Sequence, residues 1–205
     1  IPTWGVQVLT PNITESQADV EVRTAFVLPE DRSSYRFTTE IVDQKGQVVA
    51  TSASELAGTT DSVITENLQV SAPQLWTPET PNLYYAVTRL YDGDRLCDSV
   101  KTRFGIRTIE IVAEKGMFLN GKSVKFRGVC NHDDLGPLGM ALNEGALRRR
   151  LLQLKDMGAN AIRSAHNMPS PELVRLCDEM GFMLMAESFD EWRGTKVNNG
   201  YHKFF

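Results

Sequence analysis

The C-terminal half of the chain contains three short apolar runs of strand length, each followed directly by polar residues. The runs lie at 124–130, 159–163 and 182–186, and the residues after them include histidine, aspartate, asparagine and glutamate. The runs show no strict alternation of apolar and polar residues, which is typical of strands covered on both faces. This pattern constrains the second half of the chain to parallel α/β structure.

Two helical patterns separate these runs. Asn143 is a favoured cap for the first helix, and Gly158 follows its expected end. In the second pattern, Ser170 is the N-terminal cap of the helix, Pro171 takes the first helical position and Gly181 ends the helix. The expected buried stripes are Leu147, Leu151 and Leu154, and then Leu173, Leu176, Cys177 and Met180. The polar residues thus follow the C-terminal ends of the strands, where an α/β barrel builds its sites.

Residues 1–107 have a different pattern, which predicts an all-β domain. Apolar and polar residues alternate in 20–28 and 35–41, and turn residues separate such segments. Short strands at this spacing predict an immunoglobulin-like β-sandwich. The boundary is expected near 107–109, and Asn120-Gly121 predicts a two-residue hairpin turn just after it.

The second domain, residues 108–205, is too short for a complete (β/α)8 TIM barrel, which needs about 250 residues. We therefore expect a β-sandwich at 1–107 followed by a partial barrel of about three strands and two helices. The chain is interpreted as a piece of a larger protein.

Composition excludes several classes of partner. The net charge of −4 does not favour nucleic acid or an anionic membrane, and no apolar run approaches the roughly 20 residues of a membrane span. Cys97, Cys130 and Cys177 are odd in number and far apart, which argues against a zinc site or a disulfide framework. Cys177 is expected to be a small core residue. The oligomeric state and the compartment stay open.

Ordered motifs within residues 75–191 resemble glycoside hydrolase family 2. The first barrel strand of that family is matched by Asn120-Gly121-Lys122, Arg127-Gly128-Val129 and His132-Asp133, and the second by Asn160-Ala161-Ile162-Arg163-Ser164-Ala165-His166. The segment 176–181 and Glu187 resemble the next helix and strand, and 75–79, 81–84 and 103–107 resemble the end of the preceding sandwich. The run 186–192 is most similar to the β-galactosidase branch.

The resemblance implies a retaining β-glycosidase that hydrolyses terminal β-linked sugars, with β-galactosides as the first expectation. The alternatives are a β-glucuronidase or β-mannosidase of the same family, or a non-catalytic structural or carbohydrate-binding module. Retaining enzymes use two carboxylates, which this family takes from its fourth and seventh barrel strands. We expect neither in this sequence, because Asn143-Glu144 is explained by helix capping, and we expect the fragment alone to be inactive.

The substrate-binding residues implied by the resemblance are His132, Arg163 and His166. Neutral imidazoles can donate to and accept from sugar hydroxyls, although His132 could instead be a loop histidine bonded to its own backbone. Arg163 ends an apolar strand, where an unpaired charge is costly. Its partner is either the nucleophile, as the resemblance implies, or a local carboxylate of Glu187 or Asp133.

The expected pocket scaffold comprises Arg127, Asp133, Glu187 and Glu191. Arg127 and Glu187 are also candidates for a structural pair near the top of the barrel. The run at 148–150, which is three consecutive arginines, is interpreted as a solvated helix face.

The resemblance also implies a magnesium site, for which the β-galactosidases supply a glutamate and, two residues later, a histidine. Here Glu191 takes the glutamate position and Arg193 the histidine position. A guanidinium has no lone pair to offer and brings positive charge to the place of the cation. We therefore predict no metal and no other cofactor, with a carbohydrate substrate as the partner.

Overall fold

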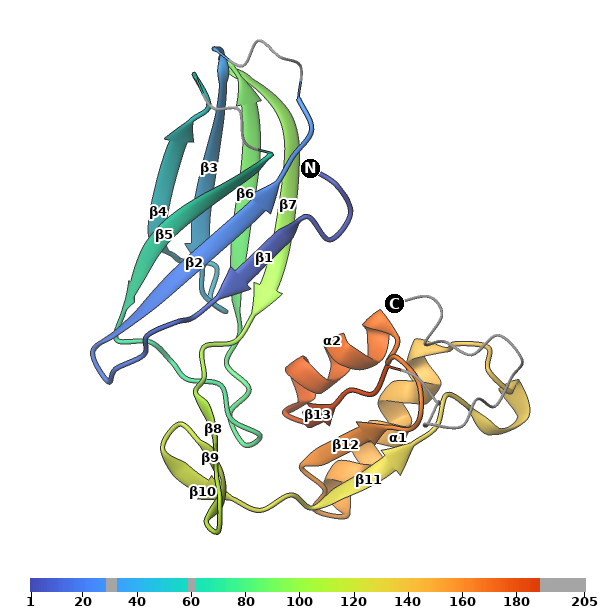
Figure 1. Ribbon diagram of the computed structural model, residues 1–205. Helices are drawn as coiled ribbons and strands as arrows, with labels where there is room; N and C mark the ends of the chain where they lie inside the picture. Colours follow the sequence, from blue (N-terminus) through green and yellow to red (C-terminus); the bar gives the residue numbers. More distant parts are fainter. Residues whose placement is uncertain (29–32, 59–61, 189–205) are drawn as a thin grey trace. The chain divides into compact units, whose positions relative to one another are not determined.

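The computed structural model describes residues 1–28, 33–58 and 62–188 (Figure 1). The chain divides into two compact units, Ile1–Ser123 and Val124–Phe205. None of the helices among the described residues is long and apolar enough to cross a membrane.

The first unit contains a sandwich of two antiparallel sheets (Figure 1). One sheet has the order β1-β2-β5, with β1 at Val6–Leu9, β2 at Gln17–Ala25 and β5 at Val63–Ser71. The other has the order β4-β3-β6-β7, with β3 at Tyr35–Val42, β4 at Val48–Glu55, β6 at Tyr84–Asp92 and β7 at Arg95–Phe104. The expected immunoglobulin-like sandwich is confirmed.

The period-two alternation of the strands builds the core between the two sheets. Val20 and Val22 of β2 pack with Ile41 of β3 and Ala86 of β6, all of them buried. Alternate residues of a strand face the same side, so one apolar face per sheet is enough to form this core.

A buried polar cluster lies within the same sandwich. Glu66 of β5 is only 2% exposed, and its Oε2 accepts a hydrogen bond of 2.5 Å from Thr39 Oγ1 of β3. Thr39 Oγ1 also lies 3.2 Å from Thr88 Oγ1 of β6. Hydroxyl groups thus offset part of the cost of burying the carboxylate between the sheets.

A three-stranded hairpin sheet, with the order β10-β9-β8, completes the first unit. Its strands are β8 at Ile109–Val112, β9 at Gly116–Leu119 and β10 at Lys122–Val124. Asn120 and Gly121 both have positive φ, 51° and 73°, as a type I′ turn requires, so the predicted turn is confirmed.

Asn120 also ties this hairpin to the sandwich. Its side chain accepts a hydrogen bond from Thr108 N at 2.9 Å and donates one to the carbonyl of the buried Trp76 at 3.0 Å. The hairpin therefore belongs to the compact unit that ends at Ser123. The division near 107–109 remains a proposal about the domains.

The second unit alternates parallel strands and helices, as expected. The strands are β11 at Gly128–Asn131, β12 at Ala161–Ser164 and β13 at Met183–Met185, in the order β11-β12-β13, and the helices are α1 at Glu144–Asp156 and α2 at Pro171–Met180. A short 3-10 helix, η1, lies at Gly136–Leu138. This is the first part of a TIM barrel without closure.

The helix ends follow the sequence signals. Asn143 accepts a hydrogen bond from Ala146 N at 2.9 Å, and Ser170 accepts one from Leu173 N at 3.2 Å. Gly158 and Gly181 have φ of 83° and 73°, which a side chain would strain. Both caps and both glycine ends are therefore confirmed.

The two helices bury their apolar stripes in one cluster with the sheet. The buried members are Leu147, Leu151, Ile162, Leu173, Leu176, Cys177 and Phe182. Burial raises the pKa of the Cys177 thiol to about 12. Cys177 is thus a core residue, as the sequence predicted.

The first apolar run differs from the expectation, because the run at 124–130 is not one strand. Val124 ends β10, and β11 begins only at Gly128. The Asn160 side chain holds the intervening backbone, since it donates to Lys125 O at 3.0 Å and accepts from Arg127 N at 2.8 Å. These side-chain contacts replace the strand-to-strand hydrogen bonds that a continuous strand would make here.

Candidate functional site

Predicted site residues follow the C-terminal ends of the three parallel strands. Asn131 ends β11 in register with Ser164 of β12, and Arg163 is in register with Met185 of β13. The segments that follow these strands therefore leave the sheet at the same edge. They carry His132 and Asp133, then His166, and then Glu187.

Arg163 and Glu187 form an ion pair at this edge. Arg163 Nε donates to Glu187 Oε1 at 2.6 Å, and both side chains are about one-third exposed or less. The Glu187 backbone N–H donates to Ser164 Oγ at 3.0 Å, which fixes the residue that carries the carboxylate. Of the partners considered for Arg163, the local pair with Glu187 is present.

Cys130 is a second neighbour of this guanidinium. Arg163 Nη1 donates to Cys130 Sγ at 3.4 Å. The hydrogen bond to Cys130, followed by the hydrogen bond to Glu187, raises the pKa of Arg163 above its ordinary value. The arginine therefore stays charged at any pH at which the protein is folded.

His166 completes a triangle with these two side chains. Its Nδ1 lies 3.4 Å from Arg163 Nη2 and 3.5 Å from Glu187 Oε2. Nδ1 can accept from the arginine in one tautomer or donate to the carboxylate in the other. In both cases the contacts hold the ring by its Nδ1 side, and Nε2 has no protein partner among the described residues.

His132 stands beside His166. The ring centroids are 5.5 Å apart and the planes meet at 73°, an edge-to-face arrangement. In the described part of the chain, the His132 ring makes no hydrogen bond to its own backbone. The two imidazoles, which the sequence places 34 positions apart, thus form one surface at the strand ends.

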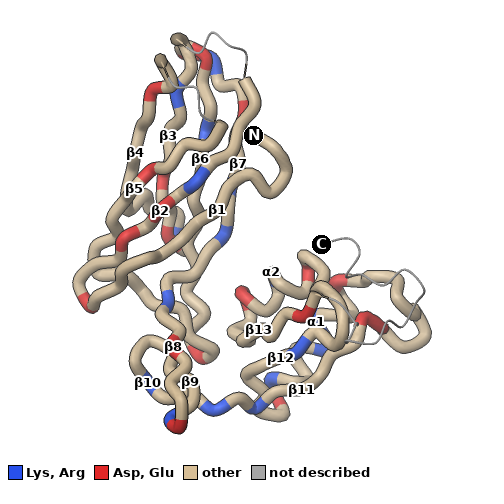
Figure 2. Tube along the Cα trace, in the orientation of Figure 1, with Lys and Arg blue, Asp and Glu red and all other residues tan. Residues whose placement is uncertain are grey.

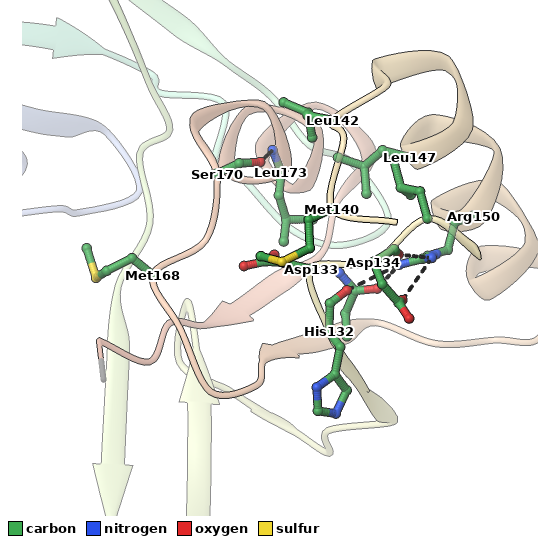
Figure 3. Close-up of a pocket in the computed structure, with 12 residues that line it drawn as sticks. His132, Asp133, Asp134, Met140, Leu142, Leu147, Arg150, Met168, Ser170 and Leu173 are labelled. Atoms are coloured by element: carbon green, nitrogen blue, oxygen red, sulfur yellow. Dashed lines mark hydrogen bonds and ion pairs between the residues drawn. The ribbon is translucent and has the colours of Figure 1, made fainter. Parts of the chain in front are cut away.

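Asp133 is placed with a cavity and not with the ion pair of Arg163 and Glu187. It lines a cavity of about 210 Å³ together with Asp134 and Arg150, and the wall on the other side is apolar (Figure 3). The apolar wall consists of Leu135, Met140, Leu142, Leu147, Met168 and Leu173. His132 also lines this cavity, but Figure 3 shows its ring pointing away from the other lining side chains.

Arg127 does not join the cluster. It precedes β11, at the opposite end of that strand from Asn131, and its Nε donates to Gly158 O at 2.9 Å. The expected pair of Arg127 with Glu187 is therefore absent, since Glu187 is bound by Arg163. Glu191 and Arg193, on which the metal expectation depends, lie outside the described residues.

Sequence reasoning missed the role of the arginine run at 148–150. Arg148 donates to Glu179 of α2 at 3.1 Å, and Arg150 binds the segment that follows β11. The expected solvated face is thus wrong for Arg150, whereas Arg148 is ion-paired with 43% of its side-chain surface still accessible. A usable signal was the spacing, because Arg148 and Arg150 flank the buried stripe formed by Leu147 and Leu151 and so lie close to neighbouring elements.

Comparison with known proteins gives matches along nearly the whole chain. Residues 6–107 match the family described as "Glycosyl hydrolases family 2", and residues 109–203 match "Glycosyl hydrolases family 2, TIM barrel domain". The beta-galactosidase BoGH2A of Bacteroides ovatus is 42% identical over 205 residues, which are 98% of this chain and 24% of that protein. A putative beta-glucuronidase of Formosa agariphila is 41% identical over 198 residues, 95% of this chain and 18% of that protein.

A solved structure agrees with these matches. The crystal structure of a glycosyl hydrolase family 2 member from Bacteroides cellulosilyticus superposes with a TM-score of 0.89 at 36% identity, over 100% of this chain and 27% of that one. The chain thus spans about a quarter or less of the length of the curated relatives above.

Proposed function

The chain belongs to glycosyl hydrolase family 2, and from this we propose that it supplies the substrate-positioning part of the active site of a retaining β-glycosidase. The proposed substrates are terminal β-linked sugars, with β-galactosides first. The single observation that carries the proposal is the cluster of Arg163, Glu187, His166 and His132 at the C-terminal edge of the parallel strands. This edge is where enzymes with a TIM barrel bind their substrates.

The chemistry of the cluster suits a sugar. Each imidazole can donate from one ring nitrogen and accept at the other, so the pair can bind vicinal hydroxyl groups that do both. The ion pair of Arg163 with Glu187 fixes the Nδ1 side of His166 and leaves Nε2 for substrate. Groups fixed in advance bind a transition state without the cost of ordering them during the reaction.

The bond cleavage itself needs two further carboxylates. A retaining mechanism uses a nucleophile and an acid/base about 5–5.5 Å apart. Glu187 is a poor nucleophile, because Arg163 and His166 engage both of its oxygens. We propose that both catalytic carboxylates come from later strands of the longer protein, and that the 205-residue chain alone does not hydrolyse glycosides.

The relatives leave two candidates for the sugar, since a β-galactosidase and a putative β-glucuronidase are almost equally similar, at 42% and 41% identity. A glucuronide carries a carboxylate that a cation would bind, whereas a galactoside is neutral. Within the cluster, the positive charge of Arg163 is already neutralised by Glu187. This favours the neutral sugar, with the glucuronide as the second candidate.

The test is a panel of aryl β-glycosides with the protein that contains the complete barrel. We expect the β-galactoside to have the highest kcat/KM, above the β-glucuronide and the β-mannoside. If only the β-glucuronide is hydrolysed, it becomes the first candidate for the substrate and the β-galactoside is rejected. No hydrolysis of any member by a folded protein would overturn the proposed function.

A further inference from the structure

Arg150 of α1 donates hydrogen bonds to the segment 131–134, which carries His132. Its Nη1 donates to Asn131 Oδ1 at 2.8 Å and to His132 O at 3.4 Å. Its Nη2 donates to Asp134 O in a short hydrogen bond and lies 3.6 Å from Asp134 Oδ1 (Figure 3). The guanidinium thus contacts the segment on both sides of Asp133.

The position of the His132 ring depends on this backbone. The ring is exposed, and among the described residues its recorded side-chain contact is the edge of His166. The Asp134 N–H donates to His132 O at 2.8 Å, so the segment makes a tight turn around Asp133. Within the described part of the chain this ring has no hydrogen bond, so the backbone of 131–134 sets the point from which the ring meets His166.

The geometry of the contact is specific for arginine. A planar guanidinium has five N–H donors in a fixed arrangement, and here two of its nitrogens bind oxygens of Asn131, His132 and Asp134. A lysine ammonium at this position would be a point charge on a flexible stem and could not reach all three in one conformation. Asn131, one of the three, is buried and ends β11, so the guanidinium links the turn to the fixed end of the strand.

We propose that Arg150 is a positioning residue that holds 131–134 so that His132 stands edge-on to His166. This inference rests on the proposed function, in which both histidines contact the sugar. It adds a residue outside the sugar site, on the neighbouring helix, that determines the shape of the site.

Arg148 is a matched control on the same helix. It has the same side chain, is more exposed, and pairs with Glu179 of α2 instead of the segment after β11. A variant of Arg148 therefore disturbs the contacts of α1 with α2 and leaves those with 131–134 in place.

The experiment measures the contact between the two rings by NMR in the 205-residue chain with labelled histidine. The chain has only three histidines, so the imidazole signals can be assigned by single substitutions. In the parent chain and in Arg148→Met we expect a nuclear Overhauser effect between the rings of His132 and His166. In Arg150→Met we expect this effect to vanish, with the His132 signals moving toward those of a free imidazole while the His166 signals stay.

Arg150→Lys keeps the positive charge on the helix. It is the variant to measure if Arg150→Met does not fold. We expect it to weaken the ring contact without abolishing it. Retention of the full contact in either folded variant of Arg150, or equal loss in Arg148→Met, would overturn the proposal. Because no substrate is used, these outcomes are independent of whether the longer protein hydrolyses glycosides.

Discussion

Glu187 Oε1 accepts a hydrogen bond of 2.6 Å from Arg163 Nε, so a residue after the third parallel strand neutralises an arginine in the second. The other carboxylate oxygen lies 3.5 Å from His166 Nδ1. Positioning of the histidine and pairing of the arginine therefore depend on the same carboxylate.

Glu187→Gln tests this dependence. The amide cannot neutralise Arg163, and we expect a decrease of about 1–2 kcal/mol in the free energy of unfolding, since the pair is only partly buried. In the protein with the complete barrel, kcat/KM should fall about 10²-fold, because His166 loses its orientation. Denaturant unfolding and steady-state kinetics measure the two effects. The exposed Glu110 provides the control, Glu110→Gln, and a Glu187 variant that behaves like it would contradict this role.

His166→Ala separates function from stability. The imidazole is exposed at the strand ends, with 41% of its side-chain surface accessible, so its removal should change the Tm little. In the complete enzyme we expect kcat/KM to fall by about 10²–10⁴-fold, or roughly 3–5 kcal/mol of transition-state contact. Calorimetry and kinetics on the same preparation check both parts. A large decrease in Tm with activity nearly intact would assign His166 to structure.

The three cysteines should differ in reactivity toward a thiol reagent. Cys97 and Cys130 are exposed, whereas Cys177 is buried and its pKa is raised to about 12. At pH 8 we expect two thiols of the folded chain to react promptly and the third only in denaturant. Peptide mapping of the labelled chain identifies them, and prompt labelling of Cys177 would contradict the packing of α2.

The same pKa shift predicts a dependence of stability on pH. Above the ordinary thiol pKa, near 9, the unfolded chain loses the Cys177 proton while the folded chain keeps it until about pH 12. The folded state then binds more protons, so the free energy of unfolding decreases as pH rises from 9 toward 12. Cys177→Ala should remove this contribution, which unfolding curves at pH 8 and pH 10.5 would detect against Cys97→Ala.

Metal removal tests the expectation for Glu191 and Arg193. An arginine at the position of a ligand cannot coordinate magnesium, so the complete enzyme should keep its activity after exhaustive chelation. Activity assays before and after dialysis against a chelator measure this. Loss of activity that magnesium alone restores would show that the enzyme depends on the ion.

The elements of the second unit were predictable because local signals determine them. The caps at Asn143 and Ser170 and the glycine ends at Gly158 and Gly181 all lie within a few residues of the helices that they bound. The start of β11 was not predictable, because it depends on the side chain of Asn160, which contacts the chain 33 and 35 residues away. Contacts of that range have no signature in a local window.

The residues of the candidate site could be predicted from the sequence, but the contacts that they make with one another could not. The resemblance to family 2 identified Arg163, His166 and His132, and the structure brings them together with Glu187. The choice of Glu187 as the partner of Arg163 required the register of β12 with β13. The contact of Arg150 with 131–134 required the orientation of α1, because a run of three arginines alone is equally consistent with a solvated face.

The most direct test of the central claim compares the 205-residue chain with the protein that contains the complete barrel, using an activated aryl β-galactoside. We expect the complete protein to release galactose first as the β-anomer, as NMR of the early product would show, because two carboxylates about 5–5.5 Å apart give retention. We expect the chain alone to show no turnover above a heat-killed control after overnight incubation. Release of the α-anomer by the complete protein, or turnover by the purified chain, would contradict the assignment of this chain to the positioning part of a retaining β-glycosidase.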